Sequence, residues 1–181
     1  MNEGLIPSRY AKALFLFAEE EGNAKTVYNQ TAQLVAGYEA HKEMAHAVEN
    51  PFLPLADKIA LLLTAAGAEK DGCLDKFFKL VFSHGRESFM HSMALAYCKR
   101  YRDVNKISQV EITTAAELSA EAVEKIKESV QTHLKGRTIE YRQRTDASLI
   151  GGFTVRVDGE VLDASMSNDL RKLRLKLLSK K

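Results

Sequence analysis

Apolar residues recur at spacings of three and four through the first 105 residues, and no segment there alternates with a period of two over any length. This pattern predicts amphipathic helices, which Gly and Pro residues divide into six. We expect the first to begin near Pro7-Ser8, because proline is tolerated at a helix start and Ser8 is able to cap. The six apolar faces lie within residues 10–18, 27–38, 44–48, 59–63, 74–81 and 89–101.

The period changes after residue 105. Val110, Ile112 and Thr114 alternate with polar residues, which predicts a half-buried strand. A helical face follows over residues 119–134, and Thr138–Gln143 again alternates as a strand would. The second half of the chain therefore mixes strands with helices.

A hairpin and a last helix complete this half. Asp158-Gly159 separates two β-rich runs, as expected of a type I′ turn with positive φ at both central residues. Gly151-Gly152 precedes the first run and permits a backbone approach that any Cβ would block. The last helix has an apolar face that can lie across the hairpin. That face consists of Met166, Leu170, Leu173 and Leu177.

These patterns predict two domains of different class. Residues 1–105 are expected to form a six-helix bundle, and residues 106–181 a small α+β domain with a β-hairpin and a terminal helix. Residues 102–107 would link them. No internal repeat or low-complexity tract interrupts this organisation.

Two helices carry more apolar or basic surface than packing alone requires. The first has a stripe wide enough to touch two surfaces, so it can serve the core, a binding groove, or both. The last carries leucines on one side and basic residues on the other. Six of the last eleven residues are Lys or Arg, with no acid among them. This helix is either packed with a solvated face or a partner site.

Few residues suggest chemistry. His84, His91 and Cys98 are each seven apart, about 10 Å along a helix, which is too far for one metal ion. Asp146 and Asp163 could pair as acid and base, but turn and capping hydrogen bonds with Ser148 and Ser165 explain them better. The chain has no phosphate-binding, nucleophile-elbow or zinc-protease motif. We therefore expect no enzyme activity, no cofactor and no metal.

Composition narrows the classes of protein to which this chain could belong. The two cysteines have no Cys-x-x-Cys spacing, which favours a reducing, cytoplasmic setting. No apolar run approaches the roughly 20 residues of a membrane span. The net charge is only +2, although the basic last helix leaves open a nucleic-acid-binding or ribosome-associated factor.

The region from Asp146 to Leu177 resembles the C-terminal signature of the ATP synthase delta subunit family, which includes the mitochondrial oligomycin-sensitivity-conferring protein. The resemblance rests on the acid before Ser148-Leu149-Ile150, on Gly151-Gly152, and on Asp163-x-Ser165 leading into Leu170 and Leu173. Residues 9–15, Arg-Tyr-Ala-Lys-Ala-Leu-Phe, resemble the family's opening motif, and His84-Gly85-Arg86 its central helix break. Ala164, Ser167 and Asp169 depart from the family pattern.

The resemblance implies a non-catalytic stator protein of the peripheral stalk in a bacterial ATP synthase. The helical domain would hold the N-terminal helix of the alpha subunit, and the α+β domain the C-terminal ends of the b subunits. The protein would lie peripherally on the cytoplasmic face of the inner membrane, one copy per complex, and be a monomer when isolated.

The same resemblance places two contact sites by position. The groove for the alpha subunit would consist of Tyr10, Ala13, Leu14 and Phe17 with Leu74, Phe77, Phe78 and Val81. The contact with the b subunits would consist of Gly151, Gly152, Asp163, Ser165 and Leu170.

Overall fold

The computed structural model describes residues 4–115, 131, 136–158 and 160–178. It separates into two compact units, Met1–Val104 and Asn105–Lys181. Most of the helix predicted over residues 119–134 lies outside the described residues.

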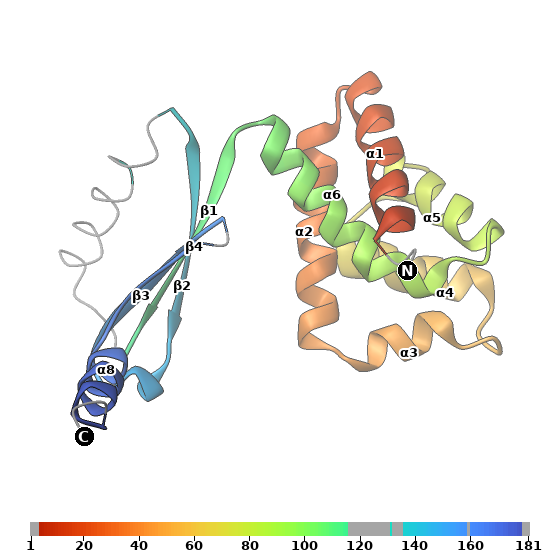
Figure 1. Ribbon diagram of the computed structural model, residues 1–181. Coiled ribbons are helices and arrows are strands. Elements are labelled where there is room, and N and C mark those ends of the chain that lie inside the picture. The colour runs from red at the N-terminus through yellow and green to blue at the C-terminus, as the bar shows by residue number, and fades with distance from the viewer. Residues whose placement is uncertain (1–3, 116–130, 132–135, 159, 179–181) are drawn as a thin grey trace. The chain divides into compact units, whose positions relative to one another are not determined.

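The first unit is helical (Figure 1). Its elements are α1 (Leu5–Glu20), α2 (Ala24–Ala40), α3 (Glu43–Glu49), α4 (Leu55–Ala66), α5 (Cys73–Ser83), the 3-10 helix η1 (Glu87–Phe89) and α6 (Met90–Val104). The six predicted helices are present, but the count of six is wrong, because η1 forms a seventh helical element. Gly85, with φ +61°, turns the chain after α5, and η1 then forms a tight turn before α6.

The first helix begins earlier than its sequence signals suggest. It starts at Leu5, and the backbone N–H of Ser8 donates to the carbonyl of Gly4 at 3.4 Å. Pro7 therefore lies inside the first turn, where its missing N–H has no partner to lose. The prediction of Ser8 as the cap is wrong for this reason.

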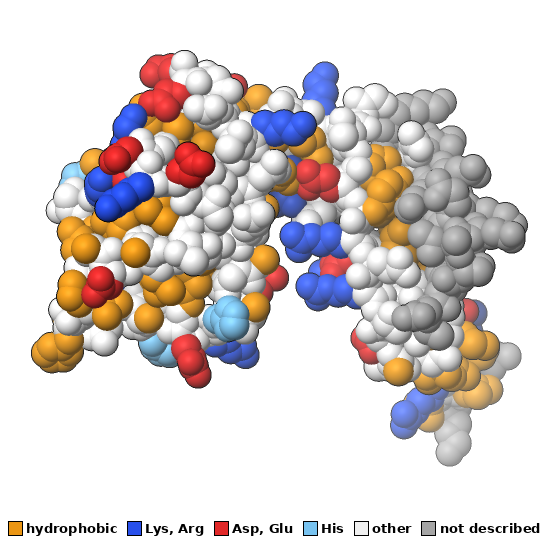
Figure 2. Space-filling model, turned by 180° about the vertical axis from the view of Figure 1, so that it is seen from behind, with side chains coloured by type: hydrophobic (Ala, Val, Ile, Leu, Met, Phe, Trp, Pro, Cys, Tyr) orange, Lys and Arg blue, Asp and Glu red, His pale blue; other side chains and the backbone are white. Residues whose placement is uncertain are grey.

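Helix α6 lies against both α1 and α2 and forms the centre of the helical core (Figure 1). Tyr97 on α6 is fully buried, and its hydroxyl donates to the carbonyl of Ala24 at 3.2 Å, which offsets the cost of burying it. Tyr101 stacks on Tyr28 with ring centroids 4.4 Å apart. Some hydrophobic side chains also reach the surface of this unit, as Figure 2 shows for one face.

The second unit is a mixed sheet with a terminal helix. It consists of β1 (Ile107–Thr114), β2 (Thr138–Thr145), the 3-10 helix η2 (Ala147–Leu149), β3 (Gly152–Val157), β4 (Glu160–Ser165) and α8 (Met166–Leu178). The strand order is β2-β1-β3-β4, with β1 parallel to β2 and the other pairs antiparallel. Both strands predicted from alternation are present, and each is longer than its pattern indicated.

One face of this sheet is apolar and the other is charged. Val110, Ile112 and Val155 form its buried core. On the opposite face, Glu111 accepts from Arg144 at 2.9 Å and lies 4.0 Å from Arg156. This alternation is what the period of two along β1 requires.

The predicted hairpin joins β3 to β4. Val157 pairs with Glu160, so the turn lies between these two residues, and Asp158 has φ +46°. The Asp158 carboxylate accepts from the Ser108 hydroxyl at 2.8 Å and from Arg137 at 3.0 Å. These bonds hold the turn against the start of β1.

Candidate binding surfaces

The first candidate surface lies where α1 meets α5. The rings of Tyr10 and Phe77 meet edge to face with centroids 6.3 Å apart, and the Lys76 ammonium lies 5.3 Å from the centre of the Phe17 ring. Glu21, which directly follows α1, contacts Cys73 at the start of α5. The two helices therefore run antiparallel, and the apolar ridge between them is about two turns long at least.

The predicted groove residues divide between this surface and the core. Tyr10 and Phe17 are half-buried and Ala13 is exposed, so these three border the surface. The other five are buried in the helical core, with Val81 fully so. They are Leu14, Leu74, Phe77, Phe78 and Val81. The structure brings the two helices together, but most of the predicted apolar anchors pack inside the unit.

Leu80 is an exposed apolar residue that the sequence pattern did not single out. It lies on α5 with its side chain 45% exposed. Its spacing of three from Phe77 places it beside that residue on the helix. This spacing could have been used to predict Leu80 from the sequence, because the apolar stripe of α5 continues from Phe77 to Leu80.

Polar contacts close the two ends of the α1–α5 surface. At one end, the Tyr10 hydroxyl and His84 Nδ1 are 2.7 Å apart, and the Arg86 guanidinium lies 5.6 Å from the Tyr10 ring centre. At the other end, the Cys73 thiol donates to Glu21 at 3.1 Å, and Lys76 donates to the same carboxylate at 3.2 Å. Cationic side chains thus lie at both ends.

The thiol and the carboxylate at the second end change each other's pKa. The bonds from Cys73 and Lys76 favour the ionised carboxylate and lower the pKa of Glu21. Burial, followed by the bond to Glu21, raises the pKa of Cys73 to about 11. Cys73 is therefore a protonated donor near neutral pH and a poor nucleophile.

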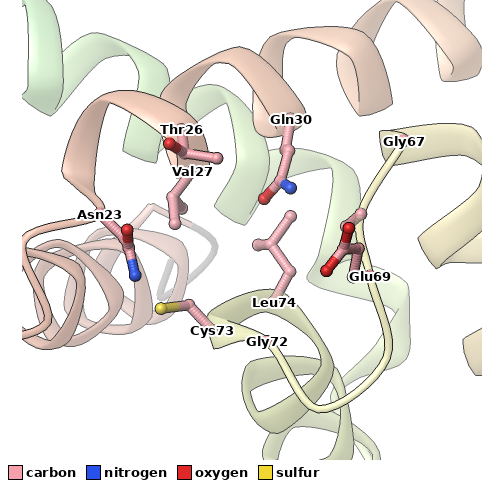
Figure 3. A pocket seen from close by; sticks show the side chains of 10 residues that line it. Asn23, Thr26, Val27, Gln30, Gly67, Glu69, Gly72, Cys73 and Leu74 are labelled. Carbon is pink, nitrogen blue, oxygen red and sulfur yellow. The ribbon is translucent and has the colours of Figure 1, made fainter.

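A hollow of about 330 Å³ lies beside this contact, between the starts of α2 and α5 (Figure 3). Cys73 and Leu74 face Asn23, Thr26 and Val27 across it. No side chain caps either helix start, and a helix N-terminus attracts negative charge. The Glu69 carboxylate also lines the hollow, however, and would repel an anionic ligand. The hollow was not anticipated from the sequence.

The second candidate surface begins at Asp163 and Ser165. The Ser165 hydroxyl donates to Asp163 Oδ1 at 2.6 Å and accepts from the backbone N–H of Asn168 at 3.2 Å. Ser165 is thus the N-cap of α8, and Asp163 orients it. The bonds from Ser165 lower the pKa of Asp163.

Asp146 has the same kind of role in another turn. Its carboxylate accepts from the backbone N–H of Ser148 at 2.9 Å at the start of η2, and the bonds from Ser148 lower its pKa. Each aspartate thus bonds its own local serine, which confirms the capping and turn interpretation for both residues.

The glycine pair holds α8 against the sheet. A Cβ at Gly151 would lie 2.5 Å from the sulfur of Met166, and a Cβ at Gly152, where φ is +77°, would collide with the backbone carbonyl of Ala164. The N–H of Met166 donates to the Gly151 carbonyl at 2.9 Å. Both glycines, predicted from sequence to allow close approach, do so here.

The apolar face of α8 is exposed. Helix α8 contacts β4 and η2, but the side chains of Met166, Leu170, Leu173 and Leu177 are between 56% and 76% exposed. The expectation that this face lies across the hairpin is therefore wrong. The tight connection of Ser165 to Met166 starts the helix at the edge strand and directs its leucines away from the sheet.

Comparisons with known proteins give the same family over almost the full chain. The family model described as ATP synthase delta (OSCP) subunit matches residues 6–177. The chain is 34% identical to the ATP synthase subunit delta of Phocaeicola vulgatus, covering 98% of this chain and 96% of that one. It is also 34% identical to the subunit delta of Parabacteroides distasonis, with 98% of each chain covered.

The chain belongs to the ATP synthase delta (OSCP) family. The resemblance stated from its motifs is thereby confirmed, and the nucleic-acid-binding alternative is not supported. Its fold is also similar to a chain in the cryo-EM structure of the Toxoplasma gondii mitochondrial ATP synthase hexamer, with a TM-score of 0.73 and 20% identity. That match covers 95% of this chain and 97% of the other.

Membership of the delta (OSCP) family makes this protein a non-catalytic stator component of the peripheral stalk of an ATP synthase. It is a peripheral part of a membrane-bound complex. Within the described residues, no helix has the length and apolar character needed to cross a bilayer.

His84 and His91 each make a contact with a different tyrosine. In the described part of the chain, no three His, Cys, Asp or Glu side chains gather as a metal site would require. His91 stacks on Tyr38 with ring centroids 5.0 Å apart, while His84 bonds Tyr10. The two histidines thus serve separate contacts.

The departure from the delta (OSCP) pattern at Asp169 has a local explanation, and Ala164 is placed in the sheet. Asp169 lies in the first turn of α8, where a negative charge interacts favourably with the helix dipole, and it pairs with Lys172 at 3.7 Å. Ala164 pairs with Phe153 in the β3–β4 ladder. Nothing in the structure explains the departure at Ser167.

Proposed function

We propose that this stator protein attaches at two places. The α1–α5 surface binds the N-terminal helix of the alpha subunit, and the C-terminal unit binds the C-terminal ends of the b subunits. The complex would hold the protein on the cytoplasmic face of the bacterial inner membrane. Two attachments on one chain add avidity, which a stalk that resists rotor torque requires.

The exposed apolar ridge between α1 and α5 carries the first part of this proposal. Ala13 and Leu80 are exposed and Phe17 is half-buried, while the neighbouring core residues are already buried. Ala13 and Phe17 follow Tyr10 by three and seven residues on α1, and Leu80 follows Phe77, which contacts Tyr10, by three residues on α5. An amphipathic helix laid along the two antiparallel helices would bury this ridge through its own i, i+3, i+4 and i+7 positions. Each Leu or Phe buried in such a contact contributes about 1.5–3 kcal/mol.

For the second part, the support is the exposed start of α8. Four of the predicted residues position α8 through contacts within the chain. They are Gly151, Gly152, Asp163 and Ser165. Leu170 is the predicted residue here that offers exposed apolar surface. A partner of the C-terminal unit would therefore make most of its contacts with α8, and few with the four residues that position this helix.

The first attachment is tested by titrating the full chain calorimetrically with a peptide that spans the N-terminal helix of the same organism's alpha subunit. We expect saturable binding that Leu80→Asp weakens by about tenfold or more, since a charge would be placed in an apolar contact. Leu95→Asp is the matched control, because Leu95 is 43% exposed on α6. Phe77 is a poorer test site, since it is buried and its replacement threatens the fold.

Retained affinity in Leu80→Asp would place the alpha peptide elsewhere. An equal loss in Leu80→Asp and Leu95→Asp would show a general effect of added charge. No binding by the folded wild-type chain, up to high micromolar peptide, would remove the α1–α5 assignment while leaving the family membership unchanged.

A further inference from the structure

Helix α8 has the apolar spacing of a coiled-coil strand. Met166, Leu170, Leu173 and Leu177 are separated by four, three and four residues, which is the d-a-d-a order of a heptad repeat. All four are more than half exposed. We refer to these four residues as the α8 seam, because in a coiled coil they would be the knobs that fit into a partner helix.

The charges beside the α8 seam are mostly basic. In the heptad register set by Leu170 at position a, Asp169 and Lys176 occupy g and Arg174 occupies e, the two kinds of position that flank a coiled-coil interface. Over the whole helix, four basic residues stand against one acid, Asp169. Figure 2 shows hydrophobic side chains beside Lys and Arg side chains at the lower end of this unit.

We propose that the α8 seam docks a helix that has its own heptad seam flanked by Glu or Asp. This inference rests on the proposed function and specifies the chemistry of the contact with the b subunits: apolar knobs along the seam, with acidic e and g positions opposite Arg174 and Lys176. Charge complementarity selects this occupant over a second copy of the chain, because two α8 helices would bring together two surfaces of net positive charge.

The test uses the full chain and two synthetic peptides of three heptads. Both have Leu at a and d; one has Glu at e and g, and the other has Lys there. Like charges at e and g keep each peptide from pairing with itself. We expect the Glu peptide to bind saturably, more weakly as salt rises, and the Lys peptide not to bind. Equal binding of the two peptides, or none of either, would overturn the proposal.

Matched variants locate the contact on α8. Leu173→Ser should weaken binding of the Glu peptide by about tenfold or more. Leu175→Ser, at position f and 61% exposed, should leave it unchanged. The double variant Arg174→Glu with Lys176→Glu should reverse the preference toward the Lys peptide. Equal effects of the two serine variants, or no reversal, would contradict the assigned register.

Two further measurements separate this inference from the proposed function. A fragment comprising the C-terminal end of the b protein that binds wild type and Leu173→Ser equally would support the attachment but overturn the α8 seam. If the Glu peptide binds wild type but not Leu173→Ser, and the b fragment does not bind at all, the α8 seam is supported and the attachment to the b subunits is overturned. A concentration-dependent dimer that Leu173→Ser abolishes, seen by sedimentation, would identify a second copy as the occupant and overturn the acidic partner.

Discussion

The hydroxyl of Tyr10 lies 2.7 Å from Nδ1 of His84, so a residue near the start of α1 is bonded to the residue that ends α5. The same Tyr10 ring meets Phe77 edge to face. One side chain thus fixes the spacing of the two helices at this end of the site proposed for the alpha subunit.

Tyr10→Phe tests the hydrogen bond alone. It should lower the free energy of unfolding of the helical unit by about 0.5–1.5 kcal/mol, because the ring contact remains. Tyr10→Leu should cost about a further 0.5–1.5 kcal/mol, because it also removes the contact with Phe77. Hydrogen exchange of α1 and α5 amides measures both. Equal protection in wild type and Tyr10→Phe would show that the bond contributes nothing.

Gly152→Ala should destabilise the C-terminal unit strongly, because it combines a positive φ with a collision against the Ala164 carbonyl. Gly136→Ala is the control, since Gly136 has φ +84° but open space around a Cβ. We expect a loss of about 1–2 kcal/mol for the control and about 3 kcal/mol or more for Gly152→Ala. Hydrogen exchange of β3 and β4 amides compares the stability of the two variants. Similar losses of stability in Gly152→Ala and Gly136→Ala would show that a small backbone shift relieves the collision.

Ser165→Ala removes the cap of α8. The backbone N–H of Asn168 loses its acceptor, which should cost about 1 kcal/mol of stability. Exchange of the amides in the first turn of α8 measures this loss, with Ser148→Ala as a comparison at a turn outside α8. Unchanged protection in Ser165→Ala would indicate that water replaces the hydroxyl at no cost.

Acid should weaken the attachment of α8 to the sheet. The Asp163 pKa is lower in the folded protein than in the unfolded chain, so its carboxylate stabilises the fold above the unfolded pKa, about 3.9. This contribution is lost as the pH falls through the lower folded pKa. A carboxyl NMR titration should show that Ser165→Ala raises the Asp163 pKa toward its ordinary value and leaves Asp146 unchanged. No change at Asp163 would remove Ser165 as the cause.

Cys73 should resist alkylation at pH 8 in the folded protein. With a pKa of about 11, roughly one thiol in a thousand is ionised there. In a Cys98→Ala background, Glu21→Gln should lower this pKa by removing the carboxylate and so accelerate labelling. Unfolding should accelerate it much more. Fast labelling of the native parent protein would contradict both the burial and the thiol–carboxylate bond.

The period of the apolar residues was sufficient to predict most elements. Helical spacing up to residue 101 and alternation at Val110–Thr114 follow directly from which side of each element is buried. The ends of the elements were less predictable, because a residue able to cap a helix does so only where no neighbouring turn has already started the helix. Ser8 could cap a helix, yet the chain already turns at Gly4, and η1 arises only from the way Gly85 redirects the backbone.

The candidate surfaces were harder to predict than the elements. The stripe on α5 is apolar around more than one side, and sequence cannot tell which side meets the core. Phe78 and Val81 proved to be interior, whereas Leu80 is at the surface. For α8, a leucine face predicts burial, but whether the chain itself or another protein covers it depends on the angle at which Ser165 and Met166 join strand to helix.

The absence of any loop between Ser165 and Met166 has a mechanical consequence. A pull on α8 would enter β4 directly, and the antiparallel hydrogen bonds to β3 would share the load across several residues at once. The bond from the Met166 N–H to Gly151 adds a second path to β3 at the junction itself. The C-terminal unit, proposed above to bind the b subunits, is thus built as a stiff coupling, in which tension passes through the backbone of the sheet and no flexible linker absorbs it.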